Sequence, residues 1–149
     1  MQQIERFCEI DAPPSVVWDV LLEFDSYPEW NPFVTSIEGE PIEGNELRVR
    51  IEPPDSRAMT FKPEVIAVKP NQRLAWHGRL GVPFVFDGYH EFRLETVGEN
   101  DDRTRLLQRE TFRGALVSVL LDQKSVSAGF TAMNEALKER AEGRVNAPV

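Results

Sequence analysis

The residues best suited to chemistry in this 149-residue chain are a histidine and a glutamate that the sequence predicts to face each other. His90 and Glu110 lie in two segments of strand composition, 84–95 and 105–114, which are joined by a turn-rich stretch at 98–102. If that loop is centred on Asn100, three acidic residues of the first segment each face an arginine of the second. The resulting pairs are Asp87 with Arg113, Glu91 with Arg109 and Glu95 with Arg105. The same register places His90 directly opposite Glu110.

The face that carries this pair is otherwise mostly apolar and holds one further polar side chain, Gln108. Polar groups in such surroundings must be hydrogen-bonded, solvated in a cavity or used by a ligand. An imidazole beside a carboxyl group in an apolar pocket is a typical general acid–base pair. The pair could equally orient a ligand, or fix the hairpin register beneath a covering helix. The residues themselves leave these three interpretations open.

The elements that must position this hairpin are predicted from hydrophobic periodicity. A strand is expected over 4–10, a buried helix over 15–24 and a short helical turn around 25–27. Four more strands are expected over 33–38, 46–52, 60–69 and 73–79, and Pro63 indicates an edge or a bulge. The last element is a long helix from about Val119 to Glu142, for which Gly143 is the expected C-cap. Its single apolar stripe is formed by Val126, Phe130, Met133, Leu137 and Ala141.

These elements predict one α+β domain over residues 1–149. A curved, seven-stranded antiparallel sheet should wrap around the long C-terminal helix, with two short helices between the first and second strands. A cavity can open where the sheet and the helix separate. Gly129 on that helix either allows a close approach by a strand or ligand, or is merely tolerated.

Composition restricts the class of partner. The net charge is −8, and basic residues are interleaved with acidic ones, so nucleic acid is not an expected partner. The longest apolar stretches fall short of the roughly 20 residues of a membrane span. Cys8 is the only cysteine and is expected to be a packed thiol, and the charged N-terminus does not resemble a signal peptide. We therefore expect a cytoplasmic protein.

The chain also lacks the spacings that hold metals and common cofactors. His77 and His90 are its only histidines, and they lie on strands with different phases. No HExxH, paired-cysteine, GxSxG, P-loop or GxGxxG pattern occurs. We expect neither a metal nor a cofactor.

Several motifs resemble the START-like helix-grip superfamily (SRPBCC), and above all its bacterial branch of polyketide cyclase/dehydrase and lipid-transport proteins. The motifs are VVWDVLLEFDSYPEWNPF, LAWHG, DGYHEF and ETFRG, and the resemblance covers about 7–141. It implies that Trp30 and Phe33 lie at the entrance of a cavity lined by strand residues such as Trp76. Aromatase members use a pocket-facing arginine or tyrosine, whereas Arg79 falls on the face opposite Trp76, which weighs against cyclase chemistry.

Three functions follow as hypotheses, and the sequence leaves open whether the protein is an enzyme. The first is non-catalytic binding of a small hydrophobic or aromatic ligand, lipid- or polyketide-like, by a monomer or homodimer. The second is a cyclase or dehydratase (a lyase) that uses His90 and Glu110 as acid and base. The third is a protein-docking module with an apolar patch around Pro83 and Phe84 or Trp30. The predicted ligand contacts are Trp30, Phe33, Trp76, Phe86, His90, Phe92, Gln108, Glu110, Phe112, Phe130 and Met133.

Overall fold

The computed structural model describes residues 2–79, 87–114 and 122–146. The elements in chain order are β1 (Gln2–Ile10), α1 (Pro14–Leu22), the 3-10 turn η1 (Phe24–Ser26), α2 (Tyr27–Trp30), β2 (Val34–Glu38), β3 (Arg48–Ile51), β4 (Met59–Phe61), β5 (Glu64–Lys69), β6 (Arg73–Arg79), β7 (Asp87–Val97), β8 (Arg103–Arg113) and α4 (Gln123–Val145). This is the α+β class expected from the sequence.

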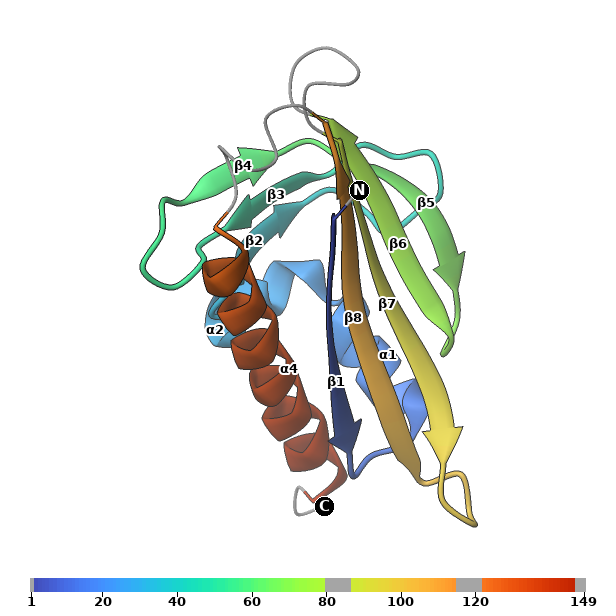
Figure 1. Cartoon of the computed structure of the whole chain (residues 1–149). Coiled ribbons are helices and arrows are strands. Elements are labelled where there is room, and N and C mark those ends of the chain that lie inside the picture. Colours follow the sequence, from blue (N-terminus) through green and yellow to red (C-terminus); the bar gives the residue numbers. More distant parts are fainter. Residues whose placement is uncertain (1, 80–86, 115–121, 147–149) are drawn as a thin grey trace.

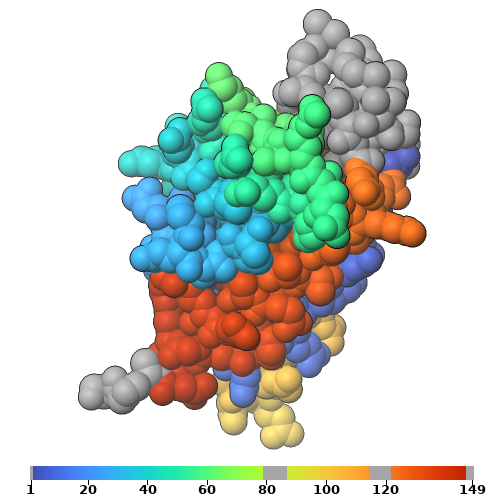
Figure 2. Space-filling model, turned by 90° about the vertical axis from the view of Figure 1, so that its left-hand side faces the viewer, coloured from blue at the N-terminus to red at the C-terminus, as the bar shows by residue number. Residues whose placement is uncertain are grey.

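The strands form two antiparallel sheets on either side of one core. The larger sheet has the order β1-β8-β7-β6-β5 and the smaller one the order β2-β3-β4. Figure 1 shows α4 running beside β1, with the smaller sheet over its N-terminal end and α1 enclosed between α4 and the larger sheet. In the space-filling view, the light-blue and green segments that include α2 and β2–β4 lie directly against α4, drawn in orange to red (Figure 2). The sheets therefore grip the helix, as predicted.

The strand count differs by one from the expected seven, because the segment predicted over 60–69 is two strands. β4 ends at Phe61 and β5 begins at Glu64, in the other sheet. Pro63 lies between them, and since proline has no backbone N–H it cannot donate to a ladder at this point. An isolated bridge from Glu46 to Glu64 keeps the two sheets adjacent across the break.

The register predicted for the β7–β8 hairpin is confirmed residue by residue. Asp87 pairs with Arg113, Glu91 with Arg109 and Glu95 with Arg105, and His90 lies opposite Glu110. At the turn, the strands extend two residues beyond their predicted ends, to Val97 and from Arg103, and so reach the predicted turn. Complementary charges on the outer face thus select the register that determines what lies on the inner face.

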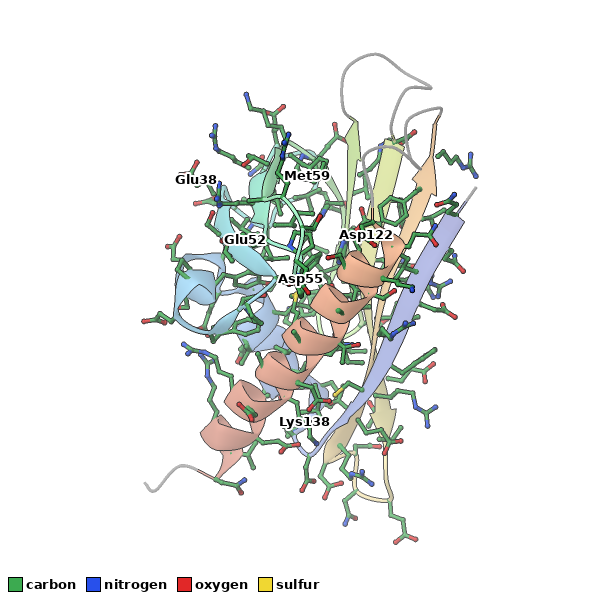
Figure 3. The ribbon with its side chains drawn as sticks, turned by 60° about the vertical axis from the view of Figure 1, so that its left-hand side comes forward. Glu38, Glu52, Asp55, Met59, Asp122 and Lys138 are labelled. Atoms are coloured by element: carbon green, nitrogen blue, oxygen red, sulfur yellow. The ribbon has the colours of Figure 1, made fainter. Side chains whose placement is uncertain are left out.

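Helix α4 has the expected buried stripe but different ends. Asp122 is the N-cap, and its carboxylate accepts from the backbone N–H groups of Lys124 and Ser125. The Ser125 hydroxyl donates to the carbonyl of Pro54, so the turn that carries Asp55 lies beside the first helical turn (Figure 3). The predicted C-cap at Gly143 is wrong, because the helix continues to Val145 and ends at Asn146. Gly143 does not have the positive φ that would select glycine at a C-cap.

Candidate functional site

A cavity lies between the two sheets and the N-terminal half of α4. It encloses about 550 Å³ between the atoms that line it, open solvent included, but the centre of a water molecule can occupy only about 40 Å³. It is therefore a narrow cleft that holds a few waters rather than a large chamber. Its lining is formed by Phe33, Val34, Val49, Ile51, Phe61, Pro63, Trp76, Gly78, Gly88, His90, Glu110, Phe112 and Val126.

Two glycines create space on the concave face of the larger sheet. Gly78 of β6 pairs with Gly88 of β7, one inward position away from the pair formed by Trp76 and His90. Neither glycine has a side chain, so the sheet surface is hollow beside an indole and an imidazole. A Cβ at Gly78 would meet Pro63 at 3.4 Å, an ordinary contact distance. The backbone at Gly78 therefore does not require glycine. The hollow exists because glycine has no side chain to fill it.

His90 and Glu110 form the polar wall of this cavity. The Nδ1 atom of His90 lies 2.5 Å from Oε2 of Glu110, a short hydrogen bond. His90 is only 4% exposed, and its ring stacks on Trp76 at 5.1 Å between centroids with an interplanar angle of 26°. The Glu110 side chain is 19% exposed and reaches the cavity surface. A histidine held between an aromatic ring and a carboxyl group has one orientation available, so the pair is preorganised.

A chain of hydrogen bonds anchors His90 from behind. Its Nε2 atom lies 3.0 Å from Oε1 of Gln108, whose Nε2 donates to Oδ1 of Asn134 on α4 at 2.8 Å. The Asn134 amide then donates to the backbone carbonyl of Arg6 on β1 at 3.3 Å. Gln108 and Asn134 are both buried. This chain therefore fixes the histidine relative to the helix as well as the sheet.

One wall of the cavity depends on a close approach to α4. Phe33 is buried, and its ring packs edge-on to Phe130 at 5.5 Å between centroids. A Cβ built on Gly129 would lie 2.3 Å from Cδ1 of Phe33. Gly129 thus allows a close approach, although it is Phe33, the residue before β2, that approaches and not a strand or a ligand. The absence of a side chain on Gly129 sets the position of the Phe33 ring.

The predicted ligand contacts separate into two layers. Five line the cavity, namely Phe33, Trp76, His90, Glu110 and Phe112. Phe92, Gln108, Phe130 and Met133 are buried in a second layer, where Phe92 and Phe130 contact the His90 ring and Gln108 hydrogen-bonds to it. Phe86, like Pro83 and Phe84 of the docking hypothesis, lies outside the described residues.

Trp30 does not belong to the cavity wall, and its position at the cavity entrance stays a prediction. It ends α2 and is absent from the lining that the described residues form. Its ring packs edge-on to Tyr27 at 5.1 Å. Tyr27 is buried, its hydroxyl donates to the carbonyl of Leu21, and burial raises the pKa of its phenol. The spacing of three residues along one helical turn brings Trp30 over Tyr27.

Several residues of the site were not identified from the sequence. Val34, Val49, Ile51 and Phe61 line the cavity from β2–β4, and only the packing of one sheet over the other brings them there. Asn134 could have been found, since it lies four residues after Phe130 on the helix face that packs on the sheet. A polar residue at such a position signals a buried hydrogen bond.

In the described residues, neither metal-ligating side chains nor the thiol of Cys8 give a second site. Among the described residues, no group of three or more His, Cys, Asp or Glu side chains could hold a metal ion. Cys8 is half-buried, and burial raises the pKa of its thiol, with the nearby Glu135 carboxylate acting in the same direction. Within the same described ranges, no helix is long and apolar enough to cross a membrane.

The described part of the surface gives the docking hypothesis no support, and Pro83 and Phe84 lie outside it. The large apolar side chains that are exposed in the described part of the chain are Phe7, Ile42, Ile66 and Val145. They lie on β1, the loop after β2, β5 and the end of α4. Single exposed apolar residues on separate elements are normal for protein surfaces and do not mark an interface.

Comparison with solved structures finds the same fold in proteins of low sequence identity. The Zhui aromatase/cyclase from Streptomyces sp. R1128 is 23% identical with a TM-score of 0.76, over 98% of this chain and 96% of that one. A START superfamily protein from Mycobacterium smegmatis is 18% identical with a TM-score of 0.72, over 95% and 98%. A norcoclaurine synthase mutant from Thalictrum flavum, in complex with a transition-state analogue, is 14% identical with a TM-score of 0.72, over 97% and 96%.

Sequence comparison identifies the family. No curated protein matches the chain significantly. The model of the family described as "Polyketide cyclase / dehydrase and lipid transport" matches residues 1–142, nearly the whole chain. Together with the helix-grip architecture shared with the aromatase/cyclase and the START superfamily protein, this match confirms the resemblance seen in the sequence motifs. The chain belongs to the polyketide cyclase/dehydrase and lipid-transport family.

Proposed function

We propose that the protein binds a small apolar molecule in the cavity between its two sheets and α4, and that it does so without catalysis. The observation that carries this proposal is the composition of the cavity wall. Eleven of its thirteen lining residues are apolar side chains, glycine or proline, and the other two are the hydrogen-bonded His90 and Glu110. Apolar walls with a few fixed polar groups are typical of small-ligand sites.

The size of the cavity limits the ligand. The space open to the centre of a water molecule is about 40 Å³, so a ligand of even one ring requires side chains to move outward. Ile51 and Phe61 are the half-buried side chains of the apolar wall, which also includes the half-buried Gly78, and they belong to the short strands β3 and β4. We therefore place the opening movement in the smaller sheet, while β6–β8 hold the polar wall fixed.

Mass spectrometry of the freshly purified protein, first native and then denatured, tests the proposal. We expect a small apolar molecule that is bound in the native protein and released on unfolding. In Gly78→Ala, an added methyl group occupies the cavity at an ordinary distance from Pro63 and should lower the bound fraction. Gly143→Ala, which has nothing within 4 Å on α4, is the matched control and should leave occupancy unchanged. Equal occupancy in wild type and Gly78→Ala would place the molecule elsewhere.

The short contact between His90 and Glu110 at the cavity surface also favours a second candidate function. A proton shared between Nδ1 and Oε2 could be moved to or from an enolisable ketone, as in a cyclase or dehydratase. This function requires a pH-dependent turnover that is lost in both His90→Ala and Glu110→Gln. Turnover that survives either substitution would exclude acid–base catalysis by the pair.

A further inference from the structure

The hydrogen-bond chain behind His90 determines where the protons of the cavity wall lie. It ends at the backbone carbonyl of Arg6, which can only accept, so the Asn134 amide nitrogen must be the atom that faces it. The other end of that amide, Oδ1, then accepts, and Gln108 must turn its own nitrogen toward it. The backbone carbonyl of Arg6 therefore determines which end of the Asn134 and Gln108 amides is the nitrogen and which is the oxygen.

The orientation of the Gln108 amide also determines which nitrogen of the His90 imidazole carries a proton. With its nitrogen used by Asn134, Gln108 presents Oε1 to Nε2 of His90 at 3.0 Å, so Nε2 must carry a proton. The other ring nitrogen, Nδ1, lies 2.5 Å from Oε2 of Glu110. Two lone pairs could not face each other at that distance, so a single proton lies between them. It belongs either to an imidazolium beside a carboxylate or to an imidazole beside a carboxylic acid.

Both arrangements leave the same group free for a ligand. Oε2 of Glu110 is occupied, and no hydrogen bond from the described residues to its second oxygen, Oε1, is found. Oε1 is an acceptor whether the shared proton is on the nitrogen or on Oε2. The His90–Glu110 pair also has a net charge of zero in both arrangements. The wall thus offers a hydrogen-bond acceptor without offering a net negative charge.

We infer that the ligand is a compact aromatic molecule with an uncharged hydrogen-bond donor, a phenolic hydroxyl, directed at Oε1 of Glu110. This inference rests on the proposed binding function and names the ligand class. Trp76, Phe112 and Phe33 supply aromatic surface for the ring. An ammonium group would be placed in an apolar cleft beside a pair with no net charge to compensate it, which is unfavourable. A ligand that only accepts hydrogen bonds would leave Oε1 buried without a partner.

The test compares 4-ethylphenol with 4-ethylanisole, which has the same ring but no donor, by calorimetry and by NMR titration of the labelled protein. We expect the phenol to bind at least about tenfold more tightly, as for one hydrogen bond to a charged or strongly polar acceptor. Glu110→Leu removes the acceptor and should abolish that preference. Glu110→Gln is the matched control: its amide nitrogen can donate to Nδ1 of His90 and leave Oε1 facing the ligand, so the preference should survive.

The outcomes separate this inference from the proposed function. Equal binding of the two compounds by the wild-type protein would overturn the donor inference while leaving apolar ligand binding intact. Binding of neither compound at the cavity would overturn the inferred aromatic ligand class, whereas the proposed function fails only if no apolar molecule is bound in the native protein. If Glu110→Leu does not fold, the wild-type and Glu110→Gln proteins still show whether an acceptor selects the phenol. Loss of the preference for the phenol in Glu110→Gln would mean that the charge of Glu110, and not a hydrogen-bond acceptor, selects the ligand.

A second readout tests the proton positions directly. Nitrogen-15 NMR of the two histidine rings should show a proton covalently bound to Nε2 of His90 in the ligand-free protein. His77, the only other histidine, is half-buried and bonded through Nε2 to Asp87, and serves as an internal reference. An unprotonated Nε2 on His90 would overturn the deduction from Asn134 and Gln108, whatever the ligand titrations show.

Discussion

Replacing Gly129 with alanine tests how the cavity wall is built. In an exposed helix interior, alanine is more stable than glycine by about 0.5–1 kcal/mol, because glycine loses more backbone entropy on folding. At Gly129, however, the new Cβ would lie 2.3 Å from Cδ1 and 2.6 Å from Cε1 of Phe33. Overpacking of this kind costs about 1–3 kcal/mol. We expect Gly129→Ala to lower the free energy of unfolding by about 1 kcal/mol.

Gly143→Ala on the same helix is the control for helix propensity alone. A Cβ at Gly143 meets nothing within 4 Å, so this variant should be as stable as wild type or more so, by up to about 1 kcal/mol. The free energies are measured by urea denaturation monitored by circular dichroism. In the double variant Phe33→Leu/Gly129→Ala, the smaller side chain should absorb the added methyl group, so the two changes should be non-additive.

Two results would refute this account of the wall. One is a Gly129→Ala protein as stabilised as Gly143→Ala, which would mean that Phe33 moves away without cost. The other is strict additivity of the Phe33 and Gly129 substitutions, which would mean that the two residues do not compete for space. If the account holds, Gly129→Ala should also alter ligand affinity, because Phe33 lines the cavity.

Three further substitutions test the surrounding structure by equilibrium unfolding. Asp122→Ala removes the N-cap of α4 and should cost about 0.5–2 kcal/mol, whereas Asp122→Asn should retain most of the stability. Gln108→Leu leaves Nε2 of His90 and Oδ1 of Asn134 without hydrogen-bond partners and should cost about 1–3 kcal/mol; no loss would show that water replaces the amide. Burial alone would raise the pKa of Glu91, but hydrogen bonds and charges from three arginines outweigh it, so that pKa lies below its usual range. A lowered folded-state pKa contributes stability above about pH 4.3 that is lost as the pH falls, and Glu91→Gln should flatten this dependence between pH 7 and 3.

The register of the β7–β8 hairpin was predictable because several pairs of residues that are close in sequence specify the same register. Three opposite-charge pairs coincide in only one register, and that register also places His90 opposite Glu110. The apolar stripe of α4 was predictable for a similar reason, since one face of a long helix repeats the same signal over several turns. The break at Pro63 was visible as an irregularity, but the sequence did not show that the chain changes sheets there.

The parts that escaped prediction depend on contacts between distant segments. Val49 and Val126 line one cavity although they lie on β3 and α4, and no local pattern brings them together. Trp30 was expected at the opening because of the prolines on either side of it, and the contact of its ring with Tyr27 across a helical turn was not predicted. Asn134 lies at a position that the helix pattern marks as sheet-facing, but its partners, Gln108 on β8 and the carbonyl of Arg6 on β1, are distant in sequence and could not be named.

The most direct test of ligand binding in the cavity is a methyl NMR titration with a panel of small aromatic and aliphatic compounds. Val34, Val49, Ile51 and Val126 carry methyl groups in the cavity wall, while Leu137 is a buried methyl-bearing residue of α4 outside that lining. We predict that at least one compound shifts the four wall residues in a saturable manner and leaves Leu137 unchanged. Titrations in which none of the four responds, or in which the shifts map to another surface, would contradict the account.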